Sequence, residues 1–135
     1  MPHLTPIALR FRDTDGMAHV NNAVYLTYLE FARMDFFIKK LGFKSVNDFS
    51  FILAHVEFDF IKPITLIDHP IVKIWVVSIG QTSWVFEYRI EEESNPNMIY
   101  AKAKSVQLVY DYENNIKMKI SDQLRKKLEE NIETH

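Results

Sequence analysis

The sequence predicts an α+β fold in which a curved antiparallel five-stranded sheet wraps around a long buried central helix. One stretch, residues 22–41, is apolar on nearly every side when it is drawn as a helix, which is typical of a buried helix. Several later stretches alternate apolar and polar residues, which is typical of half-buried strands. Short segments of turn-forming residues separate these stretches, and short turns join antiparallel neighbours.

The elements follow in a simple order along the chain. A first strand is expected in residues 4–11, and the Asp, Thr, Gly and Asn residues of 12–21 end it. The helix follows, because NAVYLTYLEFARMDFFIKKL is too long for a typical strand and rich in helix formers. Four strands are then expected, at residues 51–61, 69–79, 83–92 and 98–112, with turns at 80–81, 94–97 and 114–115. Residues 121–132 should form a short amphipathic helix capped by Ser121.

Composition limits the kind of protein. The chain has 135 residues, so one domain, residues 1–135, is expected. Cysteine is absent, which excludes disulfides, thiolate metal sites and a thiol nucleophile. The net charge of -2 argues against a surface built for nucleic acid. No signal peptide is visible in MPHLTPIALRF, and charged residues interrupt the most apolar segment, so we expect no membrane span and a soluble, cytoplasmic protein.

The chemistry is expected in RDTDGMAHVNNAVY, residues 12–25. Asp13 and Asp15 are good turn residues, and Asn21 and Asn22 are good helix caps. A helix that starts here directs free N–H groups and a partial positive charge towards the DTDG loop. Acyl transfer needs these two parts, a carboxylate and donors for a developing oxyanion. A thioester suits so sparse a site, because a thiol leaves without a dedicated acid.

Other candidates have simpler interpretations. His19 could be a second base, but it more often holds a loop by hydrogen bonds. No metal or cofactor is expected, because the spacing of Asp13, Asp15 and His19 matches no metal signature. Glu30 and Arg33 are expected to form an i,i+3 ion pair on the helix, inside the core or at a subunit interface.

Several remaining side chains are expected to be structural or solvated. Lys102 and Lys104 share a strand face that should be solvated, and the polar strand face of His55, Glu57 and Asp59 is assigned no chemistry. The aromatic side chains could form an acyl pocket or the core: Phe31, Phe36, Phe37 and Trp84.

The stretch DTDGMAHVNNAVY followed by YLEFAR resembles the signature of hotdog-fold acyl-CoA thioesterases, the family of 4-hydroxybenzoyl-CoA thioesterase and its fatty-acyl relatives. The resemblance extends over nearly the whole chain. It implies that Asp15 is the catalytic nucleophile or general base, and that the backbone N–H of Asn22 polarises the thioester carbonyl. It also implies homodimers or homotetramers with active sites between subunits.

The resemblance assigns further residues to substrate binding. His19, Asn21 and Tyr25 fall on positions that shape the pocket, and Thr82 and Ser83 fall where relatives contact the CoA arm. Two residues depart from the pattern. Ala18 stands where relatives usually carry Gly, which would cause strain if φ is positive there, with Gly16 as the flexible point instead. Asn22 stands where some relatives have His.

Three other functions fit these residues. The first is cleavage of thioesters on an acyl carrier protein. The second is a hotdog hydratase or dehydratase, in which His19 would work on the acyl chain with Glu30 as the only matching acid on the helix. The third is a non-catalytic protein that binds acyl-CoA. The acyl chain itself is not predicted by the sequence.

Overall fold

The sheet has the strand order β1-β3-β4-β5-β2, and all of its pairings are antiparallel. The structure is a computed structural model that describes residues 2–133. The strands are β1 (His3–Pro6), β2 (Phe51–Phe60), β3 (Pro70–Ile79), β4 (Ser83–Glu92), β5 (Asn95–Asp111) and the short β6 (Ile116–Lys117), which pairs with β5. The helices are α1 (Val24–Lys39) and α2 (Asp122–Glu129), with 3₁₀ turns η1 (Phe11–Asp13) and η2 (Val46–Asp48). The α+β class and the antiparallel sheet are therefore confirmed.

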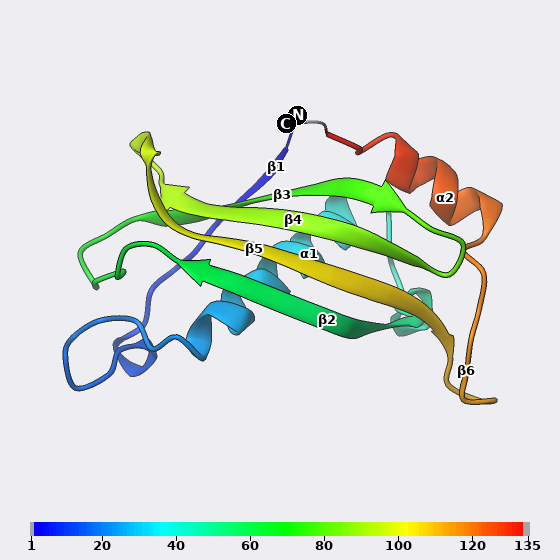
Figure 1. The fold of residues 1–135 in the computed structure, drawn as a ribbon, viewed down its shortest axis with the longest axis horizontal. Helices are drawn as coiled ribbons and strands as arrows, with labels where there is room; N and C mark the ends of the chain where they lie inside the picture. The colour runs from blue at the N-terminus through cyan, green and yellow to red at the C-terminus, as the bar shows by residue number, and fades with distance from the viewer. Residues whose placement is uncertain (1, 134–135) are drawn as a thin grey trace.

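One expected neighbour relationship is wrong. β2 does not pair with β3, the next strand along the chain, but with β5 at the far side of the sheet. Residues 61–69 cross the end of the sheet, so that β4 and β5 lie between β2 and β3 (Figure 1). This connection is longer than a hairpin turn, whereas the β3–β4 and β4–β5 links are tight.

Helix α1 is shorter and less enclosed than expected. It lies against one face of the sheet, which curves over it from one side only (Figure 1). The side towards the sheet is buried and includes Tyr25, Leu29, Ala32 and Phe36. The opposite side exposes large apolar side chains: Phe31 at 53%, Met34 at 48% and Ile38 at 52%. An all-round apolar sequence therefore does not mean a fully enclosed helix in this chain.

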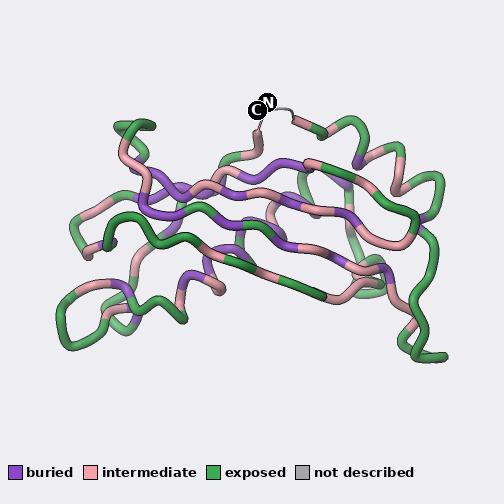
Figure 2. Tube along the Cα trace, viewed as in Figure 1, coloured by how far each residue is buried: buried purple, intermediate pink, exposed green. Residues whose placement is uncertain are grey.

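The strand β4 supplies the centre of the core, as its alternation predicts. Trp84, Phe86, Tyr88 and Ile90 are all buried, and they face the helix. Edge-to-face contacts between aromatic rings join α1 to the sheet, with the Phe36 and Phe86 centroids 5.1 Å apart, and join strands within the sheet, with those of Phe51 and Trp84 5.4 Å apart. Figure 2 shows this burial along the middle strands. Phe36, Phe37 and Trp84 are thus core residues, whereas Phe31 is exposed.

Several boundaries differ from the predicted ones. The first strand ends at Pro6, because residues 7–10 leave the sheet before η1. The β4–β5 turn is shorter than residues 94–97, since β5 already begins at Asn95. The turn at 114–115 is confirmed, with Asn115 at φ 55°. The cap of α2 is also confirmed, because Ser121 Oγ accepts the N–H of Leu124.

The two edges of the sheet differ. The outer edge of β3 is covered by β1 and, near Val76, by residues 131–133. β2 ends the strand order on the other side, and no described segment pairs with its outer edge. Much of β2 is accordingly exposed (Figure 2). Within residues 2–133, no helix has the length and apolar character needed to cross a bilayer.

Candidate active site

Asp13 has a structural role in the DTDG loop. Its buried carboxylate accepts hydrogen bonds from the Arg10 guanidinium at 2.9 Å and from the Tyr28 hydroxyl at 2.8 Å. Burial alone would raise the pKa of Asp13, but the bonds from Arg10 and Tyr28 lower it below 3.8. The same contact and burial raise the pKa of Tyr28. Asp13 therefore stays ionised and fixes η1 against α1.

Asp15 is exposed, two residues further along the chain. Its Oδ1 accepts the N–H of Met17 at 2.9 Å, and its backbone N–H donates to the carbonyl of His19 at 2.8 Å. These bonds close a tight loop over residues 15–19 and fix the direction of the carboxylate. The other oxygen, Oδ2, has no hydrogen-bond partner in the described part of the chain.

The strained position of this loop is Ala18. Its φ is 62°, in the left-handed region, so the strain that the family resemblance implied for an alanine at this position is present. Gly16 does not have a positive φ, so it does not take over this role. The loop is anchored on the other side by a β-bridge between His19 and Thr65, and by the Val20 N–H, which donates to Ile64.

The start of α1 differs in detail from the expected cap. The N-cap is Ala23, and neither Asn21 nor Asn22 occupies that position. Asn21 instead makes a local turn, with its Oδ1 accepting the N–H of Ala23 at 2.9 Å. The carbonyls of Asn21 and Asn22 accept from Val24 and Tyr25. The backbone N–H of Asn22 has no partner among the described residues.

These residues surround one pocket of about 360 Å³. Asp15, His19, Asn21, Asn22 and Tyr25 all line it, so the structure brings together five of the seven residues assigned to the site. The wall opposite them is formed by the end of β2 and the segment that follows: Phe60, Ile61, Lys62 and Pro63. Burial raises the pKa of Tyr25. The pocket thus combines a carboxylate, a residue with a free backbone donor, and a wall in which Lys62 lies beside the apolar Phe60 and Ile61.

Sequence reasoning missed this second wall. Phe60 was expected only as a strand residue, and its place beside Asp15 depends on β2 pairing with β5, which places the end of β2 next to the DTDG loop. The sequence signal that could have indicated it was Pro63, which marks the end of the strand.

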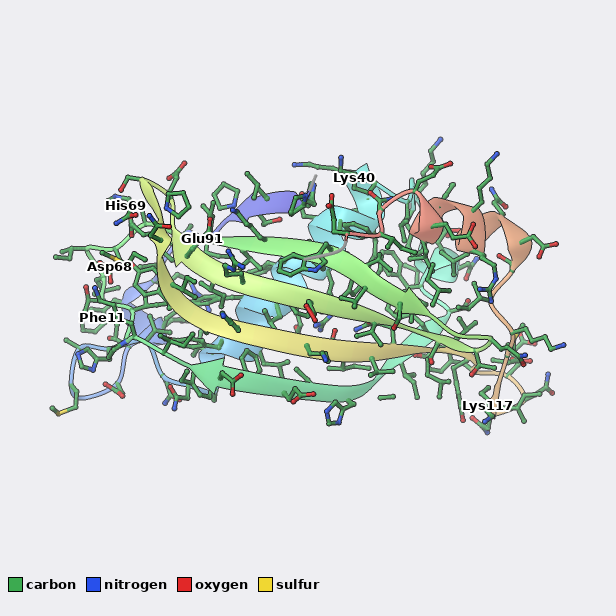
Figure 3. All side chains as sticks on the ribbon, turned by 45° about the horizontal axis from the view of Figure 1, so that its top comes forward. Phe11, Lys40, Asp68, His69, Glu91 and Lys117 are labelled. Carbon is green, nitrogen blue, oxygen red and sulfur yellow. The ribbon has the colours of Figure 1, made fainter. Side chains whose placement is uncertain are left out.

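Thr82 and Ser83 do not lie in this pocket. They follow the β3–β4 turn, at the end of the sheet where β2 begins, since the Thr82 carbonyl accepts from Val109 and Val109 lies opposite Phe51. The DTDG loop is at the other end: Figure 3 shows Phe11 and Asp68 at one extremity of the molecule and Lys117 at the other. A single copy of the chain therefore does not unite all seven residues.

The expected Glu30–Arg33 ion pair is wrong. Glu30 is exposed, whereas Arg33 is buried and donates from Nη1 to the Tyr88 hydroxyl at 3.2 Å. The side chains separate because Arg33 turns towards the sheet and Glu30 lies on the outer half of the helix. No ion pair joins them within residues 2–133.

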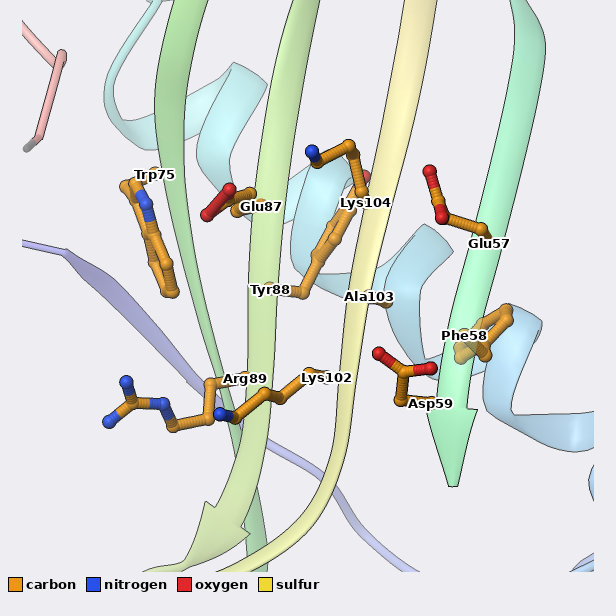
Figure 4. Close-up of a pocket in the computed structure, with 10 residues that line it drawn as sticks. All are labelled: Glu57, Phe58, Asp59, Trp75, Glu87, Tyr88, Arg89, Lys102, Ala103 and Lys104. Atoms are coloured by element: carbon orange, nitrogen blue, oxygen red, sulfur yellow. The ribbon is translucent and has the colours of Figure 1, made fainter. Parts of the chain in front are cut away.

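A second hollow, of about 300 Å³, lies on the outer face of the sheet (Figure 4). Its floor carries charged side chains of both signs in rows across β4, β5 and β2: Glu87, Lys104 and Glu57, then Arg89, Lys102 and Asp59. Lys102 and Lys104 are exposed there, as expected. This hollow has carboxylates, but no helix starts beside them to supply free N–H donors. We therefore do not assign acyl transfer to it. Within the described residues, no group of three or more His, Asp or Glu could hold a metal ion.

Known proteins show the same fold and the same family. The model of the thioesterase-like superfamily matches residues 9–128. A thioesterase from Thermus thermophilus, solved with coenzyme A and Zn, is 27% identical over 93% of this chain and 95% of its own, with a TM-score of 0.81. A predicted thioesterase from Bacillus stearothermophilus is 23% identical over 98% and 97%, with a TM-score of 0.88.

A 1,4-dihydroxy-2-naphthoyl-CoA thioesterase from Synechocystis is 15% identical over 93% of both chains, with a TM-score of 0.82. The Bacillus and Synechocystis proteins, at these identities, show the fold alone. A comparison with curated proteins found no match. The resemblance to the hotdog-fold thioesterases is confirmed by these matches.

Proposed function

The chain belongs to the thioesterase-like superfamily, and we propose that it hydrolyses acyl-CoA thioesters to the free acid and CoA. One observation carries this proposal. Asp15, which has a free carboxylate oxygen, and Asn22, which has a free backbone N–H, line the same pocket at the start of α1. The complex of the Thermus relative with coenzyme A supports the choice of CoA esters.

In the proposed reaction, the thioester carbonyl oxygen accepts a hydrogen bond from the N–H of Asn22. The partial positive charge of the α1 N-terminus stabilises the negative charge that develops on that oxygen. Asp15 Oδ2 either attacks the carbonyl carbon or removes a proton from an attacking water. The C–S bond then breaks and CoA leaves as a thiolate, which takes up a proton. Because thiols have a pKa of about 8.5, this departure needs no separate acid. Attack by water gives the free acid directly, whereas attack by Asp15 leaves an anhydride between Asp15 and the acyl group, which a water molecule then hydrolyses to release the acid and restore the carboxylate.

His19 and Asn21 position the site in this proposal. The His19 carbonyl holds the Asp15 N–H, and the Asn21 side chain holds the Ala23 N–H, so each fixes one of the two reacting groups. Tyr25 and Phe60 give the pocket an apolar wall, with ring centroids 5.0 Å apart, against which an acyl group can pack.

We further propose that two subunits pair through the free edge of β2. An antiparallel pairing of two β2 strands places Phe60 of one subunit near Phe51 of the other. Thr82 lies beside Val109, which is opposite Phe51, so it would be about three strand spacings, roughly 14 Å, from the partner's Asp15 pocket. In such a dimer, Thr82 and Ser83 of one subunit can contact the CoA arm of a substrate held by the other.

The test is thiol release from short, long and aromatic acyl-CoAs, with wild type and Asp15→Asn measured in parallel. Because the chain has no cysteine, a thiol reagent reports only the product. We expect turnover that falls by about 10³-fold or more in Asp15→Asn, at an unchanged melting temperature, because Asp15 is exposed and its role is chemical. Asp13→Asn is the matched control. It should lower stability, because Asp13 is the structural carboxylate.

Other outcomes would point to other functions. Turnover that persists in Asp15→Asn would remove Asp15 from the mechanism. No turnover with any acyl-CoA would direct attention to acyl-carrier-protein esters. Hydration that is lost in His19→Ala but kept in Asp15→Asn would indicate the hydratase. Tight binding of CoA esters without turnover would indicate an acyl-CoA-binding protein.

A further inference from the structure

Arg33 is a buried cation without a counter-ion. Its side chain is 8% exposed, and no carboxylate among the described residues forms an ion pair with it. Its Nη1 donates to the Tyr88 hydroxyl, which is in contact with the Ser105 hydroxyl. Gln107 Nε2 donates a short hydrogen bond to the same Ser105 oxygen. A buried charge is costly unless a partner of opposite charge compensates it.

Two further polar atoms in this region lack partners. Trp84 Nε1 and Gln107 Oε1 are buried and make no hydrogen bond within the described chain. Trp84 and Gln107 lie opposite one another on β4 and β5, and both are at most 1% exposed. We call Arg33, Trp84, Tyr88, Ser105 and Gln107 the core polar cluster. A cluster with an uncompensated charge and two unpartnered atoms is incomplete in this chain.

The core polar cluster lies at a defined distance from the Asp15 pocket. Tyr25, which lines that pocket, precedes Arg33 by about two turns of α1, which is about 12 Å. Along the sheet, Phe60 lines the pocket and Val56 lies opposite Ser105, so the separation along β2 is about 13 Å. The helix and the sheet thus give the same distance.

The side chains between the Asp15 pocket and the core polar cluster are small or only half-buried. On the inner face of β5, the residues between the level of Phe60 and Ser105 are Ala101 and Ala103. On β2, Val56 and Phe58 are only half-buried against the core. An extended, medium-length acyl chain that starts at Asp15 and runs along the inner face of β2 and β5 would end at the core polar cluster.

We propose that the core polar cluster binds a carboxylate at the far end of the acyl group, so that the preferred substrates are monothioesters of medium-length dicarboxylic acids. This proposal rests on the proposed thioesterase function and specifies its substrate class. Arg33 supplies the charge, and Trp84 Nε1 supplies a neutral donor. The amide of Gln107 can turn over, so that Oε1 accepts from Ser105 and Nε2 becomes a third donor. Each of the three groups then has an N–H to donate to a carboxylate bound in the cluster.

The first test measures binding without catalysis. The chain has two tryptophans, and Trp75→Phe leaves Trp84 in the cluster as the only fluorescent reporter of that type. We expect decanoate to change this fluorescence and to bind about tenfold or more tightly than the uncharged decanol, the effect of one charge-assisted hydrogen bond. Equal binding of decanoate and decanol would overturn the proposal.

Two variants test the cluster directly. Arg33→Met removes the charge, and Gln107→Glu supplies a carboxylate from within the chain. We expect each to abolish the preference for decanoate. Gln107→Glu should keep the fold even if Arg33→Met does not, because it gives the Arg33 charge a counter-ion in the same cluster. A preference for decanoate that survives in folded Gln107→Glu would show that the anion binds elsewhere.

The second test compares hydrolysis of the decanedioic acid mono-CoA ester with that of decanoyl-CoA. We expect kcat/KM to favour the first by about tenfold or more in wild type, and the ratio to fall to about one in Gln107→Glu. If neither ester is hydrolysed, the proposed function fails while the fluorescence measurement still decides whether the cluster binds a carboxylate. If both are hydrolysed equally, the function stands and the carboxylate specificity is overturned.

Discussion

Ala18 holds a left-handed backbone conformation in the loop that presents Asp15. For a residue with a Cβ atom, this conformation costs about 1–2 kcal/mol, whereas glycine adopts it freely. Ala18→Gly should therefore raise the free energy of unfolding by up to about 1 kcal/mol, after allowance for the greater entropy of glycine in the unfolded chain. Thermal denaturation measures this, and a gain of a few degrees is expected.

Two other substitutions are controls for Ala18→Gly. Asn115 also has a positive φ, at 55°, but asparagine tolerates that region, so Asn115→Gly should have a smaller effect. A Cβ atom added at Gly16 would meet no other atom within 4 Å, and φ is not positive there, so Gly16→Ala should be tolerated. A loss of stability in Ala18→Gly would show that the strain at this position is compensated by contacts of the methyl group.

At the residue scale, the sequence predicted types of residue better than their partners. DTDG identified a loop with two carboxylates, but it could not show that Arg10 and Tyr28 hold Asp13 while Asp15 is left free. Arg33 is a stronger case. Glu30, the acidic residue three positions before it, is not its partner, and Tyr88, its actual partner, is distant in sequence. Contacts of that range depend on the topology, which local spacing does not contain.

At the element scale, two carboxylates attach the N-terminal segment to α1. Asp13 joins η1 to Tyr28, and Asp35 joins β1 to the helix by accepting from His3 at 2.7 Å and from Thr5 at 3.0 Å. Burial would raise the pKa of Asp35, but the contacts with His3, Lys39 and Thr5 lower it below 3.8. Both carboxylates therefore bind their partners in the ionised form.

These lowered pKa values predict a loss of stability in acid. A carboxyl whose pKa is lower in the folded state contributes stability above its unfolded value, near 3.8, and loses that contribution as the pH falls through the folded value. The free energy of unfolding should thus decrease as the pH falls below about 4. Asp35→Asn should be less stable at neutral pH and show a shallower decrease. Urea denaturation at a series of pH values measures both effects.

The comparison variant for Asp35 is Asp111→Asn. The pKa of Asp111 is also lowered, but by bonds from Asn114 and Glu113 in an exposed turn, so its removal should have little effect on global stability. If the free energy of unfolding depends on pH in the same way in Asp35→Asn and Asp111→Asn, then the contact of Asp35 with β1 is not the cause of the loss of stability in acid.

Element types were predictable because each strand and helix has its own local period. The alternation of Trp84, Phe86, Tyr88 and Ile90 depends only on β4, and it was correct. The pairing of β2 with β5, and the face of α1 that is buried, depend on other elements. Phe31, Met34 and Ile38 are as apolar as the core residues, so their sequence cannot distinguish burial in the subunit from exposure on its surface.

At the scale of the whole molecule, the distribution of the proposed site residues is the reason for the proposed dimer. Asp15 and Thr82 lie at opposite ends of one subunit, and the outer edge of β2 has no partner within the described residues. An exposed strand edge of this length tends to pair with another strand. Pairing two β2 strands would explain both observations. It would cover the free edge of β2, and it would bring the opposite ends of two subunits into one site.

Ala54 offers a way to test the assembly without unfolding the subunit. It lies at the irregularity between Leu53 and His55, where β2 and β5 lose register, and it is exposed. Proline is tolerated at such bulges but cannot donate to a strand added at the free edge. We expect Ala54→Pro to be a folded monomer by light scattering and circular dichroism, with thioester hydrolysis greatly reduced, while Ala54→Ser keeps the N–H and the wild-type assembly. An Ala54→Pro protein that keeps the wild-type mass and activity would show that β2 is not the shared edge, and Thr82 and Ser83 would then need another route to the substrate.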